Sequence, residues 1–73
     1  MANRLIPEGA TLLKPENASR RKFDRGRSWI WSKVKDDPTF PRPIYIDRKS
    51  PLFVESELDA WIAARAAATR GRQ

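Results

Sequence analysis

The 73-residue sequence contains no cysteine and no histidine. Without thiols, neither a disulfide framework nor a thiolate metal site can brace the fold. Without either residue type, Cys–His and Ser–His nucleophiles and the usual zinc sites are excluded. The adjacent carboxylates Asp36 and Asp37 are expected to be solvated rather than held as an acid/base pair. We therefore predict a binding protein, with no catalytic residue, metal, cofactor or small-molecule substrate.

Glycine and long apolar runs are also scarce. Three scattered glycines form no glycine-rich phosphate loop. No segment approaches the roughly 20 apolar residues that cross a membrane, and no run near the N-terminus is long enough for a secretion signal. We expect a cytoplasmic protein that has no membrane partner.

Positive charge, in contrast, is abundant. The sequence has 15 Lys and Arg against 9 Asp and Glu, which gives a formal net charge of +6 and a pI near 10.5. This balance favours an anionic partner such as a nucleic acid. A chain of this length forms one domain at most and buries only about 60% of its unfolded surface, so most large apolar side chains are expected in the core.

Three regions are predicted along the chain: a flexible arm over residues 1–11, a domain over residues 12–69 and a basic tail over residues 70–73. A short helix is predicted from Pro15, because proline suits the first helical position and Glu16 favours the first turn. Its inward candidates are Ala18 and Phe23.

After a brief turn at residues 24–26, a second helix is predicted over residues 27–36. Ile30 and Val34 are four residues apart and therefore share an inward face. Pro38 disfavours helical geometry in the residue before it and ends this helix.

Two short runs of strand-favouring residues follow, at residues 44–46 and 52–54. The polar segment between them predicts a hairpin with a basic tip. A last helix is predicted from Ser56, which with Asp59 resembles a capping box, and it ends at Gly71. Its inward face is expected to carry Leu58, Trp61 and Ile62.

This order defines an α+β fold, a small winged helix-turn-helix. It consists of two N-terminal helices, a two-stranded wing and a C-terminal helix.

The second helix has an outward face opposite Ile30 and Val34. That face carries Ser28, Ser32 and Arg25, with Lys35 and Trp29 at its flanks. Hydroxyls and cations in this pattern suit a helix lying in the DNA major groove, although a solvated face has the same pattern.

The tryptophans of this helix are assigned separately. Trp31 lies nearer the buried side, so core packing is expected for it. Trp29 is expected to be more exposed, where it lies against a DNA backbone or covers a neighbouring loop. The pattern does not decide between these two roles. Stacking on unpaired bases is a third, although one aromatic is not a stacking platform.

Two further groups of cations are candidates for contacts with DNA. Arg48 and Lys49 at the hairpin tip are placed to reach a minor groove or its phosphates, and the alternative is a solvated turn. The end of the first predicted helix carries Arg20, Arg21 and Lys22. These cations either contact phosphates or interact favourably with the helix dipole.

The segments "GRSWIWSKVK", "FPRPIYI" and "LFVESELDAWIAAR" resemble the phage excisionases and the related AlpA-type regulators. The residues that carry the resemblance are Phe40, Pro41, Pro43, Phe53, Glu55, Ser56, Leu58 and Trp61. The resemblance covers roughly residues 13–66. It implies a winged-helix protein that inserts its second helix in the major groove and its wing in the minor groove of double-stranded DNA.

Excisionases of this type bend DNA beside a phage attachment site so that integrase performs excision, and they often bind as several copies. The resemblance assigns base contacts to the positions of Ser28 and Ser32. Because hydroxyls are short, Arg25, Arg27 or Lys33 are expected to take over part of this role. The resemblance also assigns minor-groove or phosphate contacts to Arg48 and Lys49.

Two other functions remain open. One is an AlpA-like transcriptional regulator that uses the same fold at a promoter. The other is a protein-interaction module, in which Trp29 and the basic surface bind an acidic partner.

Overall fold

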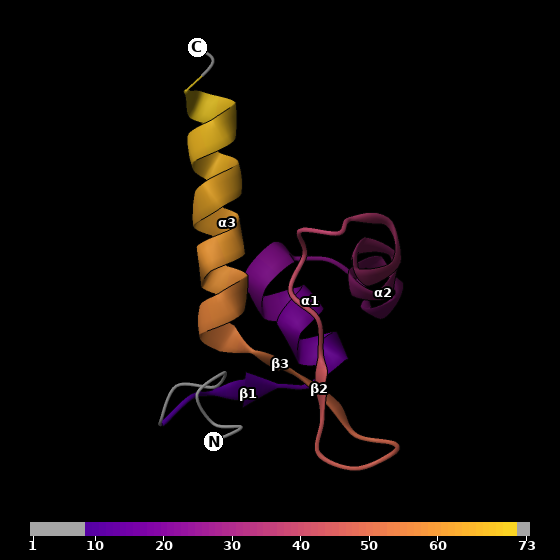
Figure 1. The fold of residues 1–73 in the computed structure, drawn as a ribbon. Helices are drawn as coiled ribbons and strands as arrows, with labels where there is room; N and C mark the ends of the chain where they lie inside the picture. The colour runs from indigo at the N-terminus through magenta and orange to yellow at the C-terminus, as the bar shows by residue number, and fades with distance from the viewer. Residues whose placement is uncertain (1–8, 72–73) are drawn as a thin grey trace.

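The computed structural model describes residues 9–71. Its elements are β1 (Leu12–Leu13), α1 (Pro15–Phe23), α2 (Arg27–Asp36), β2 (Ile44–Tyr45), β3 (Pro51–Val54) and α3 (Glu55–Arg70) (Figure 1). Three helices and a small antiparallel sheet in this order confirm the predicted α+β winged helix-turn-helix. Residues 1–8 of the predicted arm and residues 72–73 of the predicted tail lie outside the described residues.

The sheet has one strand more than predicted. Its order is β1-β3-β2, and β1 pairs antiparallel with the end of β3, with Leu12 opposite Val54 and Leu13 opposite Phe53. The amide of Glu55 extends this pairing by donating to the carbonyl of Thr11 at 2.8 Å. A strand of two residues has no periodicity of its own, because its existence depends on a partner about 40 residues away.

A tight turn connects α1 to α2, as predicted. Asp24 adopts a left-handed conformation with φ of 55°, which aspartate tolerates better than most residues. The amide of Arg25 donates to the carbonyl of Ser19 at 3.1 Å. The buried hydroxyl of Ser19 donates in turn to the carbonyl of Gly26 at 2.6 Å. These bonds satisfy the end of α1 and set the direction in which α2 starts.

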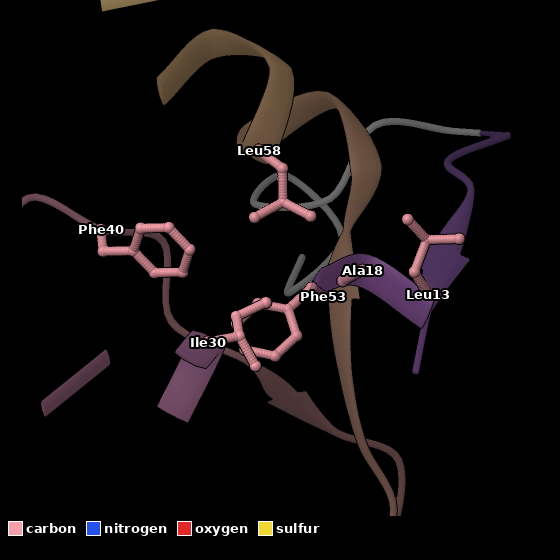
Figure 2. Close-up of a cluster of buried hydrophobic side chains, with 6 residues drawn as sticks. All are labelled: Leu13, Ala18, Ile30, Phe40, Phe53 and Leu58. Atoms are coloured by element: carbon pink, nitrogen blue, oxygen red, sulfur yellow. The ribbon is translucent and has the colours of Figure 1, made fainter. Parts of the chain in front are cut away.

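The core collects side chains from all three helices and from β1 and β3. Figure 2 shows its members: Leu13, Ala18, Ile30, Phe40, Phe53 and Leu58. Ile30 is fully buried, as expected, whereas Val34 and Trp61 are half-buried at the margin of this cluster. The predicted inward face of α2 is therefore correct, and α2 is held mainly through Ile30.

Phe40 lies at the centre of an aromatic cluster. Its ring centroid is 4.9 Å from that of Trp61, 5.9 Å from Phe23, 6.2 Å from Trp29 and 6.3 Å from Phe53. Most of these pairs are edge-to-face, the arrangement that aromatic quadrupoles favour. Phe40 thus joins α1, α2, β3 and α3, although it belongs to no helix or strand itself.

The predicted capping box at the start of α3 is wrong. The helix begins at Glu55 and its N-cap is Val54, which makes no side-chain cap bond. Because β3 runs directly into α3 and Val54 is still paired with β1, Ser56 already lies inside the first turn. Negative charge supplies the stabilisation instead, since Glu55 and Glu57 occupy that turn.

Phe40→Ala should lower the free energy of unfolding by about 3–5 kcal/mol, because it leaves a cavity where four aromatic rings meet. Tyr45→Ala is the matched control, since Tyr45 is 57% exposed while Phe40 is 1% exposed, and it should change stability by less than about 0.5 kcal/mol. Urea denaturation followed by circular dichroism measures both values. Equal effects of the two substitutions would contradict the central position of Phe40.

Candidate nucleic-acid interface

The outward face of α2 is open to solvent. Ser28 and Ser32 are exposed, on the opposite side of the helix from the buried Ile30. The first turn of α2 contains no acidic residue, and its N-cap is Gly26, which has no side chain. The positive end of the helix dipole is therefore neither neutralised nor covered by the helix's own residues.

Cations lie along α2 and in the turn before it, where Arg25 is found instead of on the helix as predicted, and they fall into two groups. Arg25, Arg27 and Lys35 are exposed, and within residues 9–71 none of them forms an ion pair. Lys33 differs, because it is half-buried and its Nζ lies 5.8 Å from the ring centroid of Trp29 and 6.0 Å from that of Trp61. Its charge is directed over the aromatic cluster by cation–π attraction.

Both tryptophans of α2 are half-buried and pack on the core. Trp31 lies 6.0 Å from Phe53 between ring centroids, in agreement with the packing role expected for it. Trp29 lies only 4.6 Å from Phe23. Trp29 therefore packs most closely on helix α1 rather than on the expected loop, whose Phe40 lies farther away at 6.2 Å, and a DNA contact remains a prediction for its exposed part.

The wing tip is shaped by Asp47. Its carboxylate accepts a hydrogen bond from the amide of Lys49 at 2.9 Å, and the amide of Ile46 donates to the carbonyl of Ser50 at 3.2 Å to close the loop. The Lys49 amide, with help from the Ser50 hydroxyl, lowers the pKa of Asp47 below its ordinary value. This turn leaves Arg48 and Lys49 exposed at the tip.

The wing lies beside the start of α2. A single hollow in the surface is lined by Arg27 and Trp31 from α2, by Lys49 and Leu52 from the wing and by the chain that starts α1. The start of α2 and the wing tip therefore meet at Arg27 and Lys49. This arrangement is what a duplex needs if it is to contact both elements.

Lys14 also lines this hollow and is exposed. Sequence reasoning missed it, because Lys14 precedes α1 and becomes a neighbour of the wing only when β1 pairs with β3. In the sequence, Lys14 is distinguished only by its position directly before Pro15, the first residue of α1. Glu16 lines the same hollow, so the cations there are partly offset.

Two of the three cations at the end of α1 form ion pairs. Arg20 pairs with Glu16 at 3.2 Å, and Arg21 is exposed. Lys22 reaches α3, where its Nζ lies 2.8 Å from Asp59 Oδ1 and 3.1 Å from Glu55 Oε2. These two carboxylates raise the pKa of Lys22, Asp59 more than Glu55. Lys22 thus joins α1 to α3, and its charge is already compensated.

Arg42 is a second residue that sequence reasoning missed. Its guanidinium donates a hydrogen bond to the carbonyl of Val34 in the last turn of α2. That bond holds the proline-rich segment against α2 before the chain enters the wing. The carbonyls at a helix end lack partners within the helix, so a cation is favoured there.

Two other classes of site are not found in the part of the chain that the structure describes. No group of three or more potential metal ligands occurs there. No helix among residues 9–71 is both long and apolar enough to traverse a lipid bilayer.

The fold and its basic, exposed helix and wing define a small winged-helix protein of the DNA-binding class. Residues 22–66 match the family model described as "Prophage CP4-57 regulatory protein (AlpA)". This match covers more than half of the chain, which therefore belongs to the AlpA family of small DNA-binding regulatory proteins, a regulatory family rather than an enzyme family. Comparison with curated proteins and with solved structures gives no significant match.

The amide of Lys49 should report the titration of Asp47. As the pH falls, the Lys49 amide chemical shift should change with a midpoint below 3.8, the ordinary value for aspartate. The sign follows from the lowered pKa: the turn is stabilised above the pKa of the unfolded chain and loses this stabilisation as the pH falls through the lower folded value. Heteronuclear NMR measures the titration, and Asp47→Asn should abolish it. A midpoint at or above 3.8 would contradict the turn.

Proposed function

We propose that this protein binds double-stranded DNA with the outward face of α2 in the major groove and the wing in an adjacent minor groove. The observation that carries the proposal is the shared hollow of Arg27 and Lys49, which lies between the wing and the first residue of α2, directly before Ser28 in the chain. One duplex that contacts this helix face also lies within reach of the wing.

The exposed residues are assigned to two kinds of contact. Ser28 and Ser32 face base edges or nearby phosphates, since hydroxyls donate and accept hydrogen bonds with either. Phosphate contacts are assigned to seven of the exposed cations that have no ion pair among the described residues: Lys14, Arg21, Arg25, Arg27, Lys35, Arg48 and Lys49. Arg20, Lys22, Lys33 and Trp29 have intramolecular partners, so we assign them a secondary role.

For the biological role, we propose an excisionase-like activity. The protein, alone or as several copies, bends DNA beside a phage attachment site in the bacterial cytoplasm, and integrase then performs excision. A helix face of short hydroxyls supports this, because it leaves much of the specificity to the deformability of the DNA. The alternative is transcriptional control at a prophage promoter, which the regulatory description of the family favours.

Binding to a mixed-sequence duplex should weaken with salt, with a log–log slope of about −6 for the seven assigned phosphate contacts. Arg27→Gln should reduce the size of this slope by about 1, because it removes one unpaired cation. Lys22→Gln is the matched control: it removes the same charge from a residue already paired with Glu55 and Asp59, and should leave the slope nearly unchanged. Fluorescence anisotropy over a salt series measures all three, and a slope near zero for the unaltered chain would reject DNA binding.

The two biological roles are separated by a recombination assay and a reporter assay run on the same prophage. With the protein present, excisive recombination by integrase should rise at least about tenfold, and the bound attachment-site DNA should show a bend in circular-permutation mobility. Unchanged recombination together with a regulated promoter would assign the transcriptional role. The Arg27→Gln variant should be impaired in whichever assay responds.

A further inference from the structure

An apolar groove runs between α3 and the proline-rich segment before the wing. The segment side is lined by Phe40, Pro41, Pro43 and Ile44, with Arg42 at the rim. The α3 side is lined by Glu57, Ala60, Trp61, Ala64 and Arg65. None of these residues belongs to the proposed DNA contacts, so the groove is a separate surface.

The α3 side of the groove has the residue spacing of a helix-packing face. Its residues recur at three- and four-residue intervals, so they form one stripe along the helix. Ala60 and Ala64 are exposed and small, which allows a second helix to approach closely. Trp61 does not block this approach, because its indole packs on Phe40 and its Nε1 donates to Thr39 Oγ1 at 3.2 Å. The C-terminal half of α3 extends past α1 and α2 (Figure 1).

Opposite charges mark the two ends of this stripe. Glu57 and Arg65 are eight residues apart, which is about 12 Å along a helix. Within residues 9–71 neither of them forms an ion pair. When a second α3 lies antiparallel across the groove, Glu57 of each copy comes within a helical turn of Arg65 of the other. Both ion pairs form at once, because a twofold axis relates them.

This self-complementarity identifies the occupant. A groove with two guanidiniums, Arg42 and Arg65, and one carboxylate, Glu57, attracts a helix that presents a carboxylate at one end and a cation at the other. The α3 stripe is such a helix. We propose that a second copy of this chain docks in the groove, with α3 antiparallel on α3, and forms an isologous dimer that does not require DNA.

Charge-reversal substitutions in the groove test the dimer directly. The unaltered chain should show a monomer–dimer equilibrium in sedimentation velocity without DNA, at concentrations up to about 1 mM, since a contact confined to one groove is small and small interfaces are weak. Glu57→Arg and Arg65→Glu should each weaken the dimer by about tenfold or more, because each replaces two attractions with two repulsions. Mixing the two variants should restore dimers, since a Glu57→Arg chain facing an Arg65→Glu chain makes both pairs attractive again.

Arg70→Glu is the matched control for Arg65→Glu. It makes the same charge change on the same helix outside the groove and should leave the dimer constant within about twofold. Circular dichroism confirms that each variant is folded. A chain that stays monomeric throughout the concentration range overturns the proposal. So does a dimer constant that neither groove substitution changes, and so does a mixture of the two variants that forms no dimers. None of these outcomes depends on DNA binding.

Discussion

The packing of Phe40 among Phe23, Trp29 and Trp61 is the interaction on which the rest of this structure depends. A domain of this size has few large side chains to bury. Phe40, which also packs on Phe53 of β3, brings four elements into contact while itself lying in an irregular segment. Because Phe40 is held in the core, the prolines that follow must leave in a defined direction. Arg42 then ties this segment to the last turn of α2. The wing consequently emerges beside α2, which is the relation that a DNA-binding face requires.

The tertiary structure also sorts the cations by function. The sequence contains an excess of Lys and Arg, but these residues have different roles in the structure. Lys22 is bound to two carboxylates of α3, and Lys33 lies over two indole rings, so both stabilise the fold. Arg27 and Lys49 remain exposed around one hollow. An anionic partner therefore meets a local concentration of positive charge rather than the average of the whole chain.

Much of the fold could be predicted because its signals are local. Pro15 starts α1, the spacing of Ile30 and Val34 orients α2, and Pro38 ends it, each through backbone or side-chain geometry that acts within a few residues. The strand β1 and the start of α3 could not be predicted in the same way. Both depend on the pairing of Leu12 with Val54, across 42 residues, and no local pattern records that pairing.

The sequence by itself determined the absence of thiol and imidazole chemistry, the basic charge, the helix-turn-helix order and the outward position of Ser28 and Ser32. These are set by composition and by the helical repeat, which do not depend on distant contacts. Only the tertiary structure decided that Lys14 and Arg27 lie with Lys49, that Lys22 is neutralised by α3, and that Ala60 and Ala64 face an open groove. Each of these features depends on contacts between segments that are far apart in the chain. Packing around Phe40 and pairing along β3 bring these segments together.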